Sequence, residues 1–137
     1  MIIKYKKLHP AAKAPFRATD GSAGWDLFSV AREEWAGGTH RHRTGLAFEV
    51  PPGHVMLLFP RSSIYRVGAH IPNSVGVIDS DYRGEVTLVF RGGKGYEPGE
   101  RIGQAVIIPV PEVIFKEAKT LSETARGTGG YGSTGER

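Results

Sequence analysis

The chain has no cysteine among its 137 residues. Disulfide bonds and thiolate chemistry are therefore excluded, and the composition suits a reducing compartment: the cytoplasm, or the host cytoplasm or nucleus for a viral protein. Long hydrophobic runs are also absent, since only Ile2 and Ile3 follow Met1 before charges begin. A secretory signal or a membrane span needs a much longer apolar stretch, so we expect neither export nor membrane association.

Positive charge is in modest excess, with a formal net charge of +4. This charge suits an anionic ligand without identifying it. Basic residues are scattered, apart from Lys6, Lys7 and the stretch 40–43. A nucleic-acid-binding barrel would need clustered aromatics on a charged sheet face, so the sequence predicts no stable nucleic-acid partner.

Turn-forming residues are abundant, with 19 glycines and 9 prolines, and they leave little room for long helices. The apolar runs between them are short, as is typical of strands. The chain is about one domain long and can bury a substantial core. We predict an all-β sandwich or barrel with one short helix over residues 61–67 and strands at residues 2–3, 46–50, 55–59, 75–78, 86–90 and 105–110.

The composition changes at residue 116. Residues 1–115 carry the predicted strands and form the expected β domain, whereas residues 116–137 are charged and then glycine-rich, with almost nothing to bury. Such a segment cannot offset the entropy of ordering by hydrophobic burial. We predict a flexible carboxy-terminal arm over residues 116–137.

Asp79 and Tyr82 lie in a cluster of turn residues between two β-branched runs, 75–78 and 86–90. This pattern predicts a hairpin that presents both side chains at its mouth. There, the carboxylate can activate a water and the aromatic ring can hold a sugar. Two simpler interpretations remain open: Asp79 bonds the local backbone, and Tyr82 is an ordinary cross-strand partner.

Two segments are candidates for binding an anion. Arg61, Ser62 and Ser63 offer a guanidinium and two hydroxyls at the predicted helix start, where a plain helix cap is an equally good interpretation. The arm carries an arginine and a tyrosine among its glycines, whose backbone N–H groups can approach an anion closely. We predict that the arm captures a phosphate and a base through Arg126, Gly130, Tyr131, Ser133 and Thr134.

Isolated polar residues add further candidates. Asn73 is a turn residue whose amide can also pair with a base, and Gln104 is either an outward strand residue or a phosphate donor. Asp26 either caps a strand end or binds a cation, directly or through water. His40 and His42 would share one face of a strand, as metal ligands do, but a solvated loop is the expected structure.

Five of these segments, taken in order, resemble the five motifs of the trimeric dUTP pyrophosphatase (dUTPase) family. They span nearly the whole chain, and the third and fifth are specific signatures. The segments are residues 23–27 (AGWDL), 60–63 (PRSS), Asn73 with 76–85 (GVIDSDYRGE), 101–104 (RIGQ) and 126–135 (RGTGGYGSTG).

The resemblance implies a β jelly-roll protomer and a homotrimer with three active sites shared between subunits, each closed by the arm of a neighbour. It implies hydrolysis of dUTP to dUMP and pyrophosphate, which limits uracil incorporation into DNA and supplies dUMP for dTTP synthesis. Mg²⁺ would bind the phosphates, and Asp26 would contact it indirectly through water.

The resemblance also implies residue roles. Asp79 would activate the water that attacks the α-phosphorus, and Tyr82 would pack on the deoxyribose. Asn73 would recognise uracil together with the backbone of residues 76–78, and Tyr131 would cover the base. The sugar and base residues are Asn73, Gly76, Val77, Ile78, Tyr82 and Tyr131. The phosphate chain would be bound by Arg61, Ser62, Ser63, Gln104, Arg126, Gly130, Ser133 and Thr134.

Departures from the family pattern are mild. Trp25 stands where tyrosine is commoner and Tyr131 where phenylalanine is usual, and residues 64–69 are bulkier than in many relatives. Both tryptophans, Trp25 and Trp35, are predicted to be packing residues. Two alternatives remain: a dCTP deaminase of the same fold, whose catalytic Glu would fall within 86–90, where none is present, and a regulatory protein that binds dUTP with little turnover.

Overall fold

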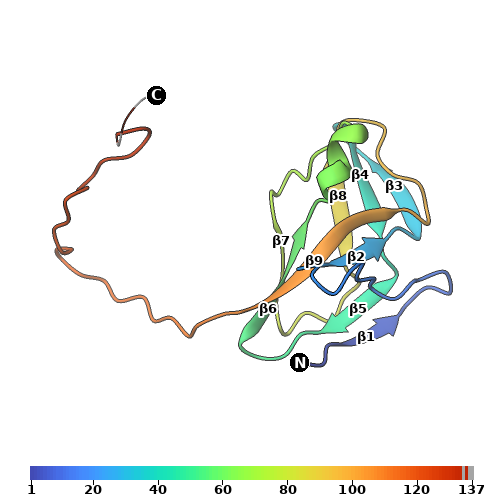
Figure 1. Cartoon of the computed structure of the whole chain (residues 1–137), viewed down its shortest axis with the longest axis horizontal. Helices are drawn as coiled ribbons and strands as arrows, with labels where there is room; N and C mark the ends of the chain where they lie inside the picture. Colours follow the sequence, from blue (N-terminus) through green and yellow to red (C-terminus); the bar gives the residue numbers. More distant parts are fainter. Residues whose placement is uncertain (134, 136–137) are drawn as a thin grey trace.

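A computed structural model describes residues 1–133 and 135. Within them the chain forms strands joined by turns and one 3₁₀ helix (Figure 1), which confirms the all-β prediction. No helix in this part of the chain is long and apolar enough to cross a membrane. The elements are β1 (Lys4–Lys7), β2 (Trp25–Phe28), β3 (Ala31–Trp35), β4 (Thr39–Arg43), β5 (Leu46–Glu49), β6 (His54–Phe59), η1 (Ser62–Arg66), β7 (Gly76–Ile78), β8 (Thr87–Arg91) and β9 (Arg101–Pro109).

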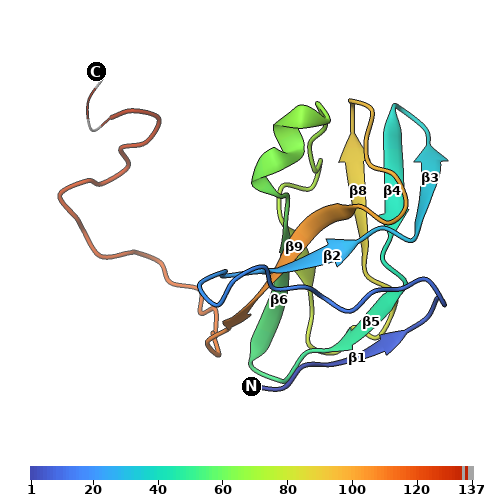
Figure 2. The ribbon, with the colours of Figure 1, turned by 45° about the vertical axis from the view of Figure 1, so that its right-hand side comes forward.

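The strands form antiparallel sheets of three sizes. The strand order is β1-β5 in the smallest, β2-β9-β6-β7 in the largest and β3-β4-β8 in the third. In Figure 2, β2 and β9 cross over β4 and β8, so the two larger sheets form the layers of a sandwich.

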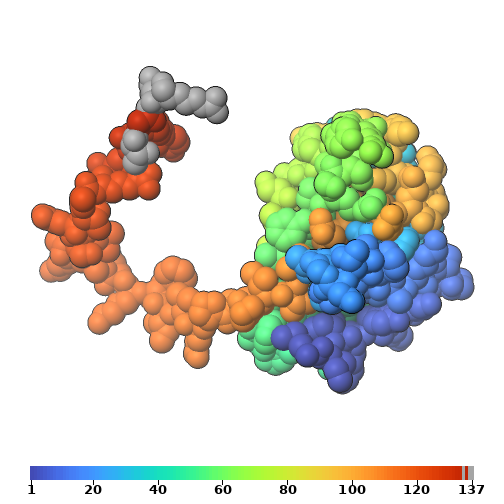
Figure 3. All heavy atoms as spheres, viewed as in Figure 1, coloured from blue at the N-terminus to red at the C-terminus, as the bar shows by residue number. Residues whose placement is uncertain are grey.

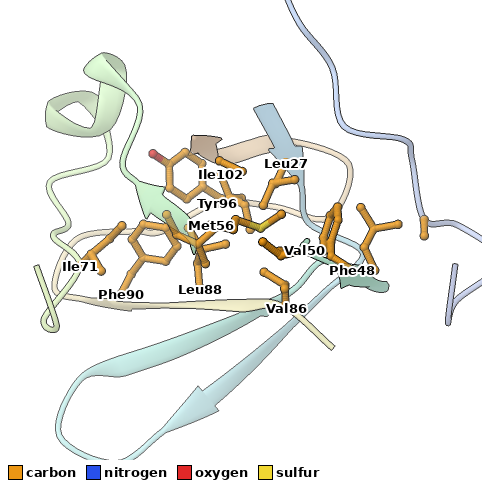
Figure 4. Close-up of a cluster of buried hydrophobic side chains, with 14 residues drawn as sticks. Leu27, Phe48, Val50, Met56, Ile71, Val86, Leu88, Phe90, Tyr96 and Ile102 are labelled. Atoms are coloured by element: carbon orange, nitrogen blue, oxygen red, sulfur yellow. The ribbon is translucent and has the colours of Figure 1, made fainter. Parts of the chain in front are cut away.

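The core lies between these layers and is built by alternation along the strands. Met56 and Leu58 are buried in β6, and Leu88 and Phe90 in β8. Because successive strand residues face opposite sides, one face of each strand enters the core and the other is left for the surface. Figure 4 shows Met56, Leu88 and Phe90 gathered with Ile102 within the sandwich.

The predicted hairpin between residues 75–78 and 86–90 is wrong. Both segments form strands, but β7 pairs with β6 and β8 pairs with β4, in different sheets. Each is the last strand of its sheet, so within the described residues their outer edges carry no strand partner. The pattern identifies strands, but tertiary packing selects their partners. Here Gly76 brings β7 close to β6, because a Cβ on Gly76 would lie 3.0 Å from the Cβ of Leu58.

The solvated loop predicted for His40 and His42 is also wrong, because both residues belong to strand β4. His40 and His42 are 2% and 0% exposed. Their ring centroids lie 5.9 and 5.5 Å from that of Phe90. The alternation of histidine and arginine looks polar on both faces, but the imidazole rings pack inward as aromatics while Arg41 pairs with Glu33 outside.

Burial determines the charge of these histidines. It lowers the pKa of His42 to about 4 and also lowers the pKa of His40. His42 Nδ1 lies 3.0 Å from the hydroxyl of Ser29, whereas Nε2 of both rings lacks a hydrogen-bond partner in the described part of the chain. The two rings are therefore neutral at physiological pH.

The tryptophans are not core residues, contrary to the packing prediction. Trp25 is 37% exposed and Trp35 is 47% exposed. The guanidinium of Arg17 lies 5.2 Å from the Trp25 ring, and that of Arg41 lies 5.0 Å from the Trp35 ring. Both indoles therefore make cation–π contacts at the surface.

Beyond β9 the chain leaves the β body. The described residues 110–133 and 135 contain no strand or helix, and they extend away from the sheets (Figures 1 and 3). Ile114 and Phe115 in this segment are 86% and 96% exposed. The described residues beyond β9 therefore add nothing to the core of their own chain.

Candidate functional site

Asp26, Arg61 and Arg101 form an ion-paired cluster at one end of the largest sheet. Asp26 Oδ1 lies 3.3 Å from Arg61 Nε, and Oδ2 lies 3.0 Å from Arg101 Nη1. The Asp26 side chain is only 14% exposed, so water screens these pairs less than it screens a surface ion pair. The carboxylate thereby fixes the direction of both guanidiniums.

Gln104 joins this cluster from strand β9. It lies opposite Asp26 in the β2–β9 pairing, and its amide Nε2 donates a 3.0 Å hydrogen bond to the carbonyl of Pro60. Gly24 makes room for it, because a Cβ on Gly24 would lie 2.7 Å from Gln104 Oε1. The sequence singled out neither Gly24 nor Arg101 as a site residue, although both lie in the quoted motifs.

The helix predicted over residues 61–67 is confirmed as the 3₁₀ helix η1, with Arg61 as its N-cap residue. Ser62 and Ser63 open the helix, and Arg61 Nη1 lies 3.5 Å from Ser63 Oγ. The cluster therefore collects guanidinium, hydroxyl and amide donors from residues 60–63 and 101–104. Such donors suit phosphate oxygens.

Asp79 and Tyr82 lie on the loop that follows β7. The Tyr82 N–H donates a 3.2 Å hydrogen bond to the Asp79 carbonyl, which closes a tight turn. The Tyr82 hydroxyl donates to the Glu85 carbonyl at 3.1 Å, and its side chain remains 44% exposed. The turn holds a carboxylate and an aromatic ring near each other at the surface, as the sequence predicts.

Gly84 and Glu85 fix this loop, although neither was predicted to be a site residue. A Cβ on Gly84 would lie 2.4 Å from the Tyr82 hydroxyl oxygen, so the ring rests directly on the glycine. The Glu85 carboxylate accepts hydrogen bonds from Arg43 Nε at 2.9 Å and from the Gly45 N–H at 2.8 Å. Glu85 therefore anchors the loop to the turn after β4, a long-range contact that a local pattern does not show.

A cavity of about 520 Å³ opens where the predicted hairpin would have closed. It lies between the outer edges of β7 and β8, whose backbone groups can face a ligand. Asn73 and Gly76 contribute to it from one side, and Thr87 and Val89 from the other. The structure thus brings two of the predicted base-binding residues to one concave site. The full lining is Leu58, Ile71, Pro72, Asn73, Gly76, Thr87, Leu88 and Val89.

The Asp79 loop and the arginine cluster lie at opposite ends of strand β7. Ile78 is opposite Met56, and Phe59 is opposite Gln104 in the same sheet. Asp79 therefore lies about four strand positions from the paired residues Phe59 and Gln104. At about 3.3 Å per residue, this is a displacement of roughly 13 Å along the strands. Val77, between the two ends, is exposed. One chain therefore does not bring all the predicted residues together.

The predicted arm residues form a third group. Arg126 Nε donates a 3.1 Å hydrogen bond to the Gly129 carbonyl, and the Tyr131 ring is fully exposed. Gly130 and Ser133 close a turn, with the Ser133 N–H donating to the Gly130 carbonyl at 3.1 Å. The predicted phosphate contact Thr134 lies outside the described residues.

Metal-binding capacity is limited in the described part of the chain, where no three His, Asp or Glu side chains gather as ligands. Asp26 still has lone pairs beyond its two ion pairs, so it can reach a cation through water. Mg²⁺ characteristically keeps several waters and binds substrate phosphates. The residues therefore fit a Mg²⁺ that arrives with a phosphate chain.

Comparisons with known proteins agree with this geometry. The family model described as dUTPase matches residues 11–135. The deoxyuridine 5'-triphosphate nucleotidohydrolase of Hydrogenobaculum sp. (strain Y04AAS1) is 42% identical over 98% of this chain and 99% of its own. That of Nautilia profundicola is also 42% identical, over 99% of this chain and all of its own length.

Solved structures show the same fold. A variant dUTPase of Staphylococcus bacteriophage 80alpha, solved with dUpNHpp, matches with a TM-score of 0.86 and 25% identity, covering 98% of this chain and 99% of its own. A variant dUTPase of phage phi11 of S. aureus, described with a structural Mg(II) ion, matches with a TM-score of 0.76 and 21% identity, covering 88% and 98%. Together with the antiparallel sheets, these matches confirm the predicted jelly roll.

Proposed function

The chain belongs to the dUTPase family, and on this premise we propose that it is a dUTP diphosphatase, which hydrolyses dUTP to dUMP and pyrophosphate. The observation that carries the proposal is the cavity between β7 and β8, with Asn73 in its wall and Asp79 on the loop that leaves β7. This activity limits uracil incorporation into DNA and supplies dUMP for dTTP synthesis, and we place it in the cytoplasm.

The cavity supports recognition of the base. Asn73 offers both a donor and an acceptor, and the edge of β7 over Gly76, Val77 and Ile78 offers backbone groups. In this proposal the base lies against the backbone edge of β7, and the exclusion of thymine depends on a steric conflict of its methyl group with that wall. Tyr82 packs on the deoxyribose and excludes a 2′-hydroxyl.

Asp79 is the general base in this proposal. Its exposed carboxylate accepts a proton from the water that attacks the α-phosphorus. The bond from that phosphorus to the bridging oxygen breaks, and pyrophosphate leaves. Phosphoryl-type substitution depends on positioned charge more than on covalent catalysis, which suits a chain without cysteine.

The arginine cluster binds the phosphate chain. Arg61, Ser62, Ser63 and Gln104 supply donors that Asp26 and the β2–β9 pairing hold in place. From the arm, Arg126, Gly130, Ser133 and Thr134 contact the far end of the phosphates, and Tyr131 covers the base.

When bound, Mg²⁺ would supply positive charge that polarises the phosphates and stabilises the leaving group. Asp26 would hold it through water, with the ion pairs to Arg61 and Arg101 kept in place.

A homotrimer with shared sites explains the separation of the three groups of residues. The Asp79 loop and cavity of one subunit, the arginine cluster of a second and the arm of a third would together surround one dUTP. The extension of residues 110–133 away from the sheets, with Phe115 96% exposed, supports an arm that covers a neighbour rather than its own chain.

The two alternatives make different demands on the cavity. A dCTP deaminase of this fold requires a carboxylate on the strand after the loop, where Val89 lines the cavity. A dUTP-binding regulator has no need of a base placed for water attack, and it would bind without turnover.

The proposal is tested by pyrophosphate release from dUTP, dTTP, dCTP and UTP, each with Mg²⁺ and with chelator. We expect release from dUTP alone, and its loss on chelation. Ammonia released from dCTP would establish the deaminase instead. Binding of dUTP without release of any product would establish the regulator.

A further inference from the structure

The outer face of helix η1 carries two large side chains that the proposed phosphate cluster does not use. Tyr65 is 71% exposed, and Arg66 is exposed in the last turn. Arg66 Nε donates a 3.1 Å hydrogen bond to the Tyr65 hydroxyl, and the guanidinium lies 5.6 Å from the tyrosine ring centroid. The pair holds the guanidinium in one orientation and leaves its two terminal NH₂ groups to face an anion.

The geometry of a 3₁₀ helix aligns this pair with the two serines of the cluster. Side chains three residues apart eclipse each other in such a helix, so Tyr65 follows Ser62 and Arg66 follows Ser63 along the same faces. The rise of about 2 Å per residue places each pair roughly 6 Å apart along the axis. Arg66 thus adds a guanidinium on the face of the helix that carries Ser63.

The helix is held as a rigid platform. Ile64 and Val67 pack against the hydrophobic core, which turns the opposite side outward. The Lys94 N–H donates a 3.0 Å hydrogen bond to the Val67 carbonyl. A Cβ on Gly93 would lie 2.0 Å from the same oxygen, so the loop containing Gly93 rests directly on the helix end. The backbone that carries the Arg66 side chain is therefore fixed in position.

The cluster of Asp26, Arg61 and Arg101 has a net charge of only about +1, which is small for binding a triphosphate. Asp26 is paired with both Arg61 and Arg101, so its carboxylate offsets one of the two positive charges. A nucleoside triphosphate carries several negative charges in a row, and charge-assisted bonds to guanidiniums are the strong ones. No carboxylate is paired with Arg66 in the described part of the chain.

We infer that Arg66 binds the end of the phosphate chain that leaves as pyrophosphate, and that Tyr65 is a positioning residue for its guanidinium. This rests on the proposed dUTP hydrolysis and assigns a further substrate contact to it. Such a contact strengthens binding of dUTP and pyrophosphate but not of dUMP, which lacks the phosphates concerned.

Arg66→Ala tests the contact by steady-state kinetics and product inhibition. We expect the KM for dUTP and the inhibition constant of pyrophosphate to rise about tenfold, the scale of one charge-assisted contact. The inhibition constant of dUMP and kcat should stay within about twofold of wild type. Tyr65→Phe, which keeps the ring and removes the hydroxyl, should raise the same two constants by a smaller factor. Lys7→Ala removes a positive charge from exposed β1 and should change none of them.

The outcomes separate this inference from the proposed function. If wild type hydrolyses dUTP and Arg66→Ala has unchanged constants for dUTP and pyrophosphate, the contact is refuted while the function stands. If Arg66→Ala weakens the binding of dUMP as much as the binding of pyrophosphate, the contact is refuted as well. Should wild type hydrolyse no nucleotide, calorimetric titration with pyrophosphate still decides, since only Arg66→Ala, and not Lys7→Ala, should weaken its binding.

Discussion

Asp26 and Arg101 are separated by 75 positions in the sequence, yet their side chains are joined by a 3.0 Å ion pair. The antiparallel pairing of β2 with β9 produces this contact, and Arg61 approaches the same carboxylate from the end of β6. One carboxylate therefore orients two guanidiniums that come from different parts of the chain.

Asp26→Asn should lower kcat/KM for dUTP about 30-fold, because both guanidiniums lose the charge that directs them. Asp20→Asn, on an exposed turn of the preceding loop, removes the same charge and should have little effect. Steady-state kinetics at saturating Mg²⁺ measure both variants. Equal activity of Asp26→Asn and wild type would mean that neither arginine needs this carboxylate.

Asp79→Asn should reduce kcat for dUTP about 1,000-fold and leave dUTP binding within a few-fold of wild type, because the amide cannot accept a proton from water. The matched control is Asp81→Asn, which changes an exposed carboxylate on the same loop. Single-turnover hydrolysis and equilibrium binding separate the two effects. A normal rate in Asp79→Asn would remove this residue from the mechanism.

Gly84→Ala should weaken the selection of dUTP over UTP. The added Cβ would lie 2.4 Å from the Tyr82 hydroxyl oxygen and would push the ring off the sugar position. We expect the ratio of kcat/KM for dUTP over UTP to fall about tenfold. Gly21→Ala, where a Cβ meets nothing within 4 Å, is the control. An unchanged ratio would show that Tyr82 does not exclude the 2′-hydroxyl.

The buried His42 should make folding stability fall as the pH drops from about 6.5 to about 4. Burial lowers its folded pKa to about 4 from an unfolded value of 6.5, helped by His40 and Arg32 and opposed by Glu34 and Glu100. Between these values the unfolded chain binds more protons, so the free energy of unfolding decreases on acidification. The loss is at most about 3 kcal/mol.

Urea denaturation at several pH values tests this. In His42→Gln, the free energy of unfolding should change less with pH between pH 4 and 6.5 than in wild type. In His70→Gln, where the substituted residue is exposed, its change with pH should be the same as in wild type. The same slope in wild type and His42→Gln would assign the acid sensitivity to other groups.

Subunit mixing tests the shared site. A chain truncated after Leu121 lacks the glycine-rich segment and should keep its fold but lose most activity, since the described residues beyond this point make no core contacts. The Asp79→Asn chain retains the arm. When the two inactive variants are refolded together, random trimers should recover about a quarter of the sites, because one subunit supplies Asp79 and another the arm. No recovery in mixed oligomers would show that each chain completes its own site.

The local pattern of the chain was enough to predict its fold class and most of its strands. Short apolar runs between glycines and prolines predicted β5 to β9, and a proline followed by helix-compatible residues predicted η1. The strand predicted at residues 2–3 is wrong, because β1 begins only at Lys4. Local residue chemistry singled out most of the candidate residues, the resemblance of five segments to a family implied their roles, and the comparisons confirm that family. Local chemistry suffices here because turn residues and β-branched residues act on their own backbone.

Tertiary structure alone decided which strands pair and which side chains meet. It separated β7 from β8, so that a cavity lies where the sequence predicted a closed hairpin. It buried His42 in a strand of alternating polar residues, and it paired Asp26 with two arginines. These choices depend on contacts between residues far apart in the chain, whose free energy comes from shape and burial in the assembled fold rather than from any local preference.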